Sequence, residues 1–191
     1  MGQGEIESAL LQLAKKYQES FAGKIYAFEN DERDLLMDAF GITPELKREN
    51  RQYWGRELGM CWQLLVTRLC SMTSQNFQPG LKVGDDEPCD FRLGSDAVDT
   101  KYRVGSGDAG TLKKFRAYGK LLTDAGYRPV MLFVRSDNLQ AAITACRAGG
   151  WTLLMESDSF EYIRINTGFD LRGWLVKVTA SGELKVSRSK A

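Results

Sequence analysis

The 191-residue chain contains no histidine, and this absence narrows the chemistry that it can perform. Without an imidazole there is no Ser-His-Asp or Cys-His catalysis, no histidine-containing zinc site and no histidine proton shuttle. A reaction that needs activated water must therefore use other groups, and a metal ion with a lysine is one of the few arrangements left.

Cysteine pairs and long apolar runs are also lacking. The four cysteines form no CxxC pair, which argues against a zinc ribbon, and their apolar neighbours predict buried thiols. No apolar run approaches the roughly 18 residues of a membrane span, and no signal peptide is recognisable. We therefore expect a soluble, cytoplasmic protein with no membrane partner.

The length fits one compact domain, and 26 basic against 25 acidic residues leave no strongly charged tail. The first 40 residues contain four basic and eight acidic residues, so they are unsuited to nucleic acid. We expect 1–43 to be a helical segment for packing or dimerisation. A core over 44–155 and a C-terminal extension over 156–191, with possible DNA contacts, would complete the domain.

The apolar pattern predicts alternating helices and strands. Helices are expected over 5–21, 31–40, 44–71, 111–125 and 137–148, with a further helical piece from residue 157 or 159. Strands are expected over 89–93, 97–104, 130–134 and 151–155, and a loop over 74–88. Thr43, Thr111 and Asp137 are the expected helix caps. This order predicts an α/β fold with a mixed β-sheet flanked by helices.

Charge is concentrated in the middle of the chain. Six acids and one base lie between residues 85 and 99, and eight bases and two acids lie between 101 and 135. Carboxylates can hold a hard cation, and the cation and the bases together can hold phosphate oxygens. The alternative interpretation is a solvated hairpin beside a solvated helix.

The spacing within this region is more informative than its charge. Asp99 and Lys101 are two apart on a predicted strand, so they share a face. A tight hairpin through the turn at 94–96 can bring Asp90 beside Asp99. Two adjacent carboxylates are unfavourable without a cation, and Mg²⁺ usually takes one or two of them. Lys101 would then orient or deprotonate an attacking water.

The segments Pro88-Cys89-Asp90 and Asp99-Thr100-Lys101 resemble the PD-(D/E)XK nuclease superfamily, and more narrowly the type II restriction endonucleases. The resemblance covers roughly 44–155 and implies a restriction-endonuclease-like core. It implies that Asp90 and Asp99 bind metal and that both act in catalysis with Lys101. The family often adds a glutamate from the preceding helix, for which Glu57 is the candidate.

The chain departs from this family pattern in two ways. A cysteine separates the proline from Asp90, and a helix is expected between the motif strand and the next core strand. Glu49 is the other glutamate that could serve, but it lies nearer the start of the predicted helix.

A glycine-rich segment follows the motif over 101–115, and it is similar to segments of the ApaLI-like group of restriction enzymes. Its three glycines let the backbone approach a ligand closely, and free amides at the start of the next helix favour an anion. In a nuclease that anion is a DNA phosphate. The expected DNA-binding residues are Arg103, Ser106, Thr111, Lys113 and Lys114. No phosphate-binding loop of the GxxxxGK[ST] type is present, so we expect no nucleotide cofactor. The alternative is a flexible turn and a solvated helix face.

These observations favour a Mg²⁺-dependent type II restriction endonuclease that hydrolyses phosphodiester bonds in double-stranded DNA at a specific short site. Cleavage of both strands at a palindrome predicts a homodimer. Two alternatives remain open at this point. The same core could serve in DNA repair or junction resolution, or the chain could be a nucleic-acid-binding module without catalysis.

Overall fold

The structure is a computed structural model that describes residues 3–22, 30–105, 107–184 and 186. The helices are α1 (Gln3–Ala22), α2 (Leu35–Ala39), α3 (Pro44–Glu49), α4 (Arg51–Thr73), α5 (Ala109–Asp124), α6 (Gln140–Ala148), α7 (Ser157–Thr167) and α8 (Leu171–Ser181). The strands are β1 (Phe77–Pro79), β2 (Phe91–Leu93), β3 (Asp96–Lys101), β4 (Arg128–Phe133) and β5 (Thr152–Met155).

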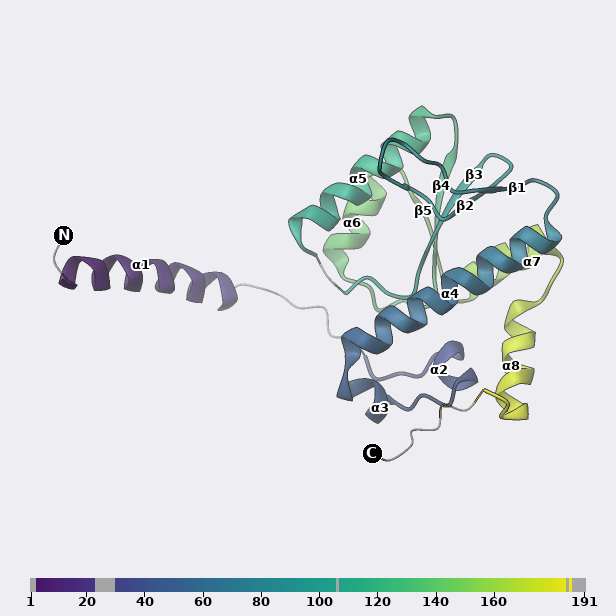
Figure 1. Cartoon of the computed structure of the whole chain (residues 1–191), viewed down its shortest axis with the longest axis horizontal. Coiled ribbons are helices and arrows are strands. Elements are labelled where there is room, and N and C mark those ends of the chain that lie inside the picture. The colour runs from purple at the N-terminus through teal and green to yellow at the C-terminus, as the bar shows by residue number, and fades with distance from the viewer. Residues whose placement is uncertain (1–2, 23–29, 106, 185, 187–191) are drawn as a thin grey trace.

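The five strands form one mixed sheet in the order β1-β2-β3-β4-β5 (Figure 1). β2 pairs antiparallel with β1 and with β3, whereas β4 pairs parallel with β3 and with β5. Parallel neighbours need a crossover connection, which α5 and α6 provide. The predicted α/β class with a mixed sheet flanked by helices is therefore confirmed.

Two hydrophobic cores lie on opposite faces of the sheet. Met131 and Phe133 of β4 face a core shared with α5 and α6, whereas Val130 and Leu132 face a core shared with α4, α7 and α8. This alternation is the two-residue period of a strand. Leu36 and Met37 of α2 join the second core, so part of the segment 1–43 serves in packing.

Two glycines bring α5 against α6. A Cβ on Gly119 would lie 2.1 Å from the carbonyl oxygen of Gly149, and a Cβ on Gly149 would lie 2.6 Å from the carbonyl oxygen of Phe115. Backbones this close leave no room for any side chain. Trp151 donates its indole N–H to the same Phe115 oxygen at 2.8 Å, which joins the start of β5 to α5.

A buried arginine ties the N-terminal segment to the end of β4. Arg135 is only 4% exposed, and its guanidinium donates to the carbonyl oxygen of Glu32 at 2.8 Å and to the Asp34 carboxylate at 3.0 Å. Its Nε donates to the Asp137 carboxylate at 2.8 Å. The prediction that Asp137 caps a helix is therefore wrong, because its carboxylate is taken by this ion pair and α6 begins later.

The helix predicted over 44–71 is two helices. Thr43 caps α3 as predicted, but the chain turns at Asn50. The Asn50 side chain accepts a hydrogen bond from the Tyr53 amide and so starts α4. Asparagine caps helices well because its side chain satisfies an amide that lacks a helical partner.

Two other expectations are corrected. The predicted loop over 74–88 contains the short edge strand β1, whose last residue, Pro79, is tolerated because an edge strand leaves one side unpaired. The helix predicted to start at Thr111 begins at Ala109, because the Asp108 carboxylate accepts from the Thr111 amide at 2.9 Å and caps α5.

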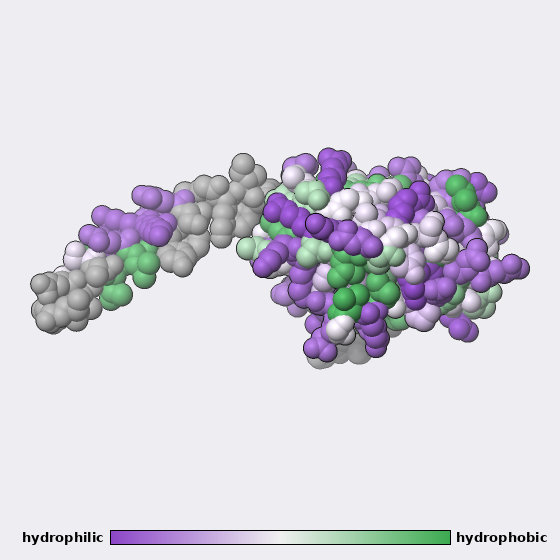
Figure 2. All heavy atoms as spheres, turned by 90° about the horizontal axis from the view of Figure 1, so that it is seen from above, coloured by the Kyte–Doolittle hydropathy of each residue, from purple (hydrophilic) through white to green (hydrophobic). Residues whose placement is uncertain are grey.

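Most of the visible surface in Figure 2 is hydrophilic, with apolar residues gathered in a patch on the body and along one side of α1. In the part of the chain that the structure describes, none of the helices has the length and apolar character needed to cross a bilayer.

Candidate active site

The hairpin of β2 and β3 sets the position of the two motif carboxylates. Gly94 adopts the left-handed conformation that the tight turn requires (φ 58°), and Phe91 pairs with Val98. The Asp90 amide donates to the Val98 carbonyl oxygen at 2.9 Å. The hairpin therefore holds Asp90 beside β3, close enough for the charge of Asp99 to raise its pKa.

Asp90 is held in place from both sides. Its Oδ2 accepts hydrogen bonds from the Thr100 amide at 2.7 Å and from the Thr100 hydroxyl at 2.6 Å. Its Oδ1 accepts from the Gln63 side-chain amide of α4 at 2.7 Å. The backbone near Asp90 is also closely packed, because a Cβ on Gly80 would lie 2.4 Å from the carbonyl oxygen of Cys89. A carboxylate with three donors has one defined orientation.

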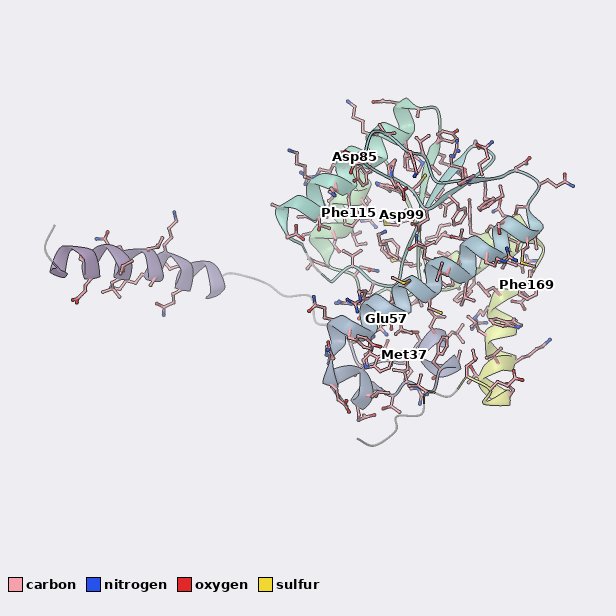
Figure 3. The ribbon with its side chains drawn as sticks, viewed as in Figure 1. Met37, Glu57, Asp85, Asp99, Phe115 and Phe169 are labelled. Atoms are coloured by element: carbon pink, nitrogen blue, oxygen red, sulfur yellow. The ribbon has the colours of Figure 1, made fainter. Side chains whose placement is uncertain are left out.

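Asp99 and Lys101 form an ion pair on one face of β3. Lys101 Nζ lies 2.8 Å from Oδ1 and 2.7 Å from Oδ2 of Asp99, and it also donates to the Thr100 carbonyl oxygen at 3.2 Å. The shared face predicted from the two-residue spacing is therefore observed. Figure 3 shows Asp99 on the sheet, near α5, which carries Phe115.

The electrostatics of the three residues are coupled. Burial, and next the charge of Asp99, raise the pKa of Asp90 to about 6. Burial works against the charged form of Lys101, but Asp99 and Asp90 outweigh it, so the pKa of Lys101 is raised. Lys101 is therefore a cation at neutral pH, and Asp90 titrates closer to neutral pH than an ordinary aspartate does.

Glu57, the expected third metal ligand, is not brought to this pair. Its Oε1 lies 3.1 Å from Arg56 Nη2, and the side chain lines a groove with Met60 and Leu64 (Figure 3 labels Glu57 on α4). Gln63 follows Glu57 by six positions on α4, so the two side chains point about 120° apart around the helix axis. Gln63, rather than Glu57, contacts Asp90 from α4.

Sequence reasoning missed Gln63 because it considered only carboxylates. A readable signal was present. Gln63 directly follows Trp62, which is fully buried against the sheet and donates to the Leu132 carbonyl oxygen. A polar residue next to the buried Trp62 lies at the edge of the contact between α4 and the sheet. Asp90, which precedes β2, lies at the same edge.

The predicted DNA-binding residues occupy different environments. The Arg103 side chain is only 10% exposed, and its Nε donates to the Asp137 carbonyl oxygen at 2.9 Å, so it does not present a free face. Thr111 donates its hydroxyl to the Asp108 carboxylate at 2.7 Å. Lys113 and Lys114 are exposed. Ser106 lies outside the described residues.

A small cavity of about 150 Å³ adjoins the ion pair. Asp99 and Lys101 line one side, and Thr111 and Lys114 of α5 line another. The side chain of Lys113 points about 100° away from that of Lys114 around the axis of α5. Lys113 is not among the described residues that line this cavity. The structure thus brings Asp90, Asp99, Lys101, Thr111 and Lys114 to one end of the sheet.

Among the described residues, no three histidine, cysteine, aspartate or glutamate side chains gather as a metal-binding group. The oxygen atoms available to a metal at the site are those of the Asp90 and Asp99 carboxylates and of the neighbouring Thr100. Comparison with family models, curated proteins and solved structures finds no match for this chain. The case for a function therefore depends on the geometry and chemistry of the site.

Proposed function

We propose that this chain is a Mg²⁺-dependent endodeoxyribonuclease of the type II restriction class, which hydrolyses phosphodiester bonds in double-stranded DNA at a short specific site. The observation that carries the proposal is the register of the hairpin. It holds Asp90 beside β3, where the charge of Asp99 acts on it, and Asp99 and its partner Lys101 line a cavity that Lys114 also lines. Two neighbouring carboxylates and a fixed ammonium group thus lie beside a cavity that a phosphate group could enter.

The residues fit a magnesium ion. Asp90 and Asp99 would hold it, because the charge of Asp99 opposes the ionisation of Asp90 and raises its pKa, and a cation would relieve that repulsion. Mg²⁺ prefers oxygen donors and keeps several waters when one or two carboxylates bind it. When bound, it supplies positive charge for the phosphate oxygens and lowers the pKa of a water.

The remaining chemistry belongs to the residues of the chain. Lys101 keeps its proton at neutral pH because Asp99 and Asp90 raise its pKa. It therefore donates hydrogen bonds that orient the attacking water and stabilise charge on the phosphate, rather than accepting the proton. Thr100 and Gln63 fix the direction of the Asp90 carboxylate.

The basic start of α5 supplies the binding of neighbouring phosphates. Lys114 lines the same cavity as Lys101, and Lys113 lies on the adjacent exposed face of the helix. Such contacts position the duplex without reading its sequence. Cleavage of both strands needs two sites, which a two-fold homodimer provides.

The test is incubation of the full chain with supercoiled plasmid and phage DNA, with Mg²⁺ or with EDTA. Discrete fragments with Mg²⁺ and intact DNA with EDTA are expected, whereas a smear would mean a nuclease without site specificity. Intact DNA in every reaction, together with no effect of Mg²⁺ on the thermal midpoint, would overturn the proposal.

Single substitutions test the assignment of the residues. Asp90→Ala, Asp99→Ala and Lys101→Ala should each abolish cleavage while DNA binding is largely retained, because these side chains face the metal or the water. Lys120→Ala, which removes an exposed charge from α5, is the control and should cleave normally. A variant that keeps more than about a tenth of the wild-type rate, a barrier change of only about 1.4 kcal/mol, would remove that residue from the mechanism.

A further inference from the structure

An apolar groove of about 660 Å³ runs along α4, on the side that carries Glu57. Met60, Leu64 and Met72 of α4 line it and are each more than half exposed. Phe169, just before α8, and Trp174 of α8 line it as well. Contiguous apolar surface of this kind is uncommon on a soluble monomer and marks an interaction site.

The chain also contains a helix with exposed leucines. Leu10, Leu11 and Leu13 of α1 are each more than half exposed, and α1 stands apart from the body in both Figure 1 and Figure 2. A single helix is only marginally stable by itself in water, because most helical stability in proteins comes from packing an apolar face. Both the groove and the helix would therefore be stabilised by a partner that buries their apolar side chains.

We propose that two copies of this chain associate by placing α1 of each copy in the α4–α8 groove of the other. The part of α4 that lines the groove, from Glu57 to Met72, is about 22 Å long, and the 20 residues of α1 make a helix of about 30 Å. The helix is thus long enough to cover the groove. An apolar helix in an apolar groove is a common mode of recognition.

The second copy is the occupant because one chain carries both halves of the contact. A reciprocal exchange covers both exposed surfaces with no third component, and it closes as a two-fold dimer with two identical contacts. The biological need for two copies rests on the proposed cleavage of both DNA strands. The interface itself is argued only from the groove and the helix.

The order of charges fixes the direction of the helix. Along α1 an acid, Glu7, is followed by the leucines and then by Lys15 and Lys16. Along the groove an acid, Glu57, is followed by apolar residues and then by Arg68. Because each apolar stretch has an acid before it and a base after it, antiparallel docking places Glu7 near Arg68 and the lysines near Glu57. Complementary charges of this kind set register and orientation.

Light scattering after size-exclusion chromatography tests the association, in buffer without DNA or Mg²⁺. The wild type should be a dimer. Leu10→Asp/Leu13→Asp in α1 and Leu64→Asp in the groove should each raise the dimer dissociation constant at least about tenfold. Ile165→Asp is the matched control, because Ile165 is an equally exposed apolar residue on α7 outside the groove.

A wild type that stays monomeric at all concentrations, or a dimer that is indifferent to both groups of variants, would overturn the proposal. Circular dichroism of each variant checks that the fold is kept, which is expected because Leu64 is 63% exposed. The catalytic variant Asp99→Ala should still be a dimer. A dimer that does not cut DNA would therefore refute only the nuclease, and a monomer that cuts would refute only this interface.

Charge reversal tests the orientation. Arg68→Glu should weaken the dimer by bringing like charges together, and adding Glu7→Arg should restore it. A parallel arrangement would instead set the lysines near Arg68 and Glu7 near Glu57, so that both substitutions would replace repulsion by attraction. A dimer strengthened by Arg68→Glu, or failure of the rescue, would therefore reject the antiparallel docking.

Discussion

Asp90 destabilises the fold whenever its carboxyl group is ionised without a cation. Burial and the charge of Asp99 raise its pKa from the ordinary 3.8 to about 6. An acid whose pKa is raised by folding contributes stability that is fully present below its unfolded pKa and is lost as the pH rises through its folded pKa. The gap between the two values corresponds to about 3 kcal/mol. The wild type therefore loses this contribution between about pH 4 and pH 6.

The substitution Asp90→Asn removes the ionisation and keeps the shape. Its amide oxygen can still accept from Thr100, and the Gln63 amide can turn to present its oxygen to the new NH₂ group. At about pH 8 and with EDTA, the variant should gain up to about 3 kcal/mol in the free energy of unfolding. For a chain of this length that is roughly 6–12 °C in the melting temperature. Near pH 4 the two proteins should be about equally stable.

Urea unfolding at several pH values measures this difference, with Asp85→Asn as the control because Asp85 is exposed on a loop. The control should show no comparable dependence on pH. Mg²⁺ should stabilise the wild type above about pH 6 and should not stabilise Asp90→Asn, because ligand that binds only the folded state adds to its stability. An equal gain at both pH extremes, or a loss at high pH, would refute the reasoning about the carboxylate pair.

Two further predictions concern α5. Lys114→Ala should weaken binding to all DNA sequences alike and reduce the slope of log affinity against log salt by about one, and Lys113→Ala should change both less, because Lys114 lines the cavity beside the ion pair. Unchanged salt slopes for the double variant Lys113→Ala/Lys114→Ala would place the DNA elsewhere. Gly119→Ala should lower stability by about 1–3 kcal/mol, because its Cβ would overlap the Gly149 carbonyl oxygen. The control Gly55→Ala should raise stability by up to about 1 kcal/mol in a urea titration, because a Cβ there meets open space in a helix. Equal effects of the two substitutions would contradict the proposed close packing.

The sequence predicted those parts of the fold that depend on local patterns. The hairpin carrying Asp90 and Asp99, the apolar strand at 130–134 and the helix after the glycine-rich segment are all present, because turn residues and apolar periods determine them. The predicted shared face of Asp99 and Lys101 is also observed, since side chains in any strand alternate.

The parts that sequence reasoning missed depend on competition between neighbours. Asn50 lies inside an apparently continuous helical pattern, but its side chain caps α4, so the chain forms two helices there instead of one. The three residues of β1 are too few to show alternation. Gln63 meets Asp90 across a sequence separation of 27 residues, which no local pattern encodes.

The contacts of Arg135 determine where the smallest autonomously folding piece of this chain must begin. A fragment starting at residue 44 would contain the motif strands but would lack Glu32 and Asp34, which accept two of the hydrogen bonds from this buried guanidinium. Removing the partners of a buried charge typically destabilises a protein by about 3–5 kcal/mol. A similar argument applies at the other end, because Leu171 and Leu175 are buried in the core beside α4. The folding unit therefore extends from about residue 30 through α8, beyond the motif-bearing segment on both sides.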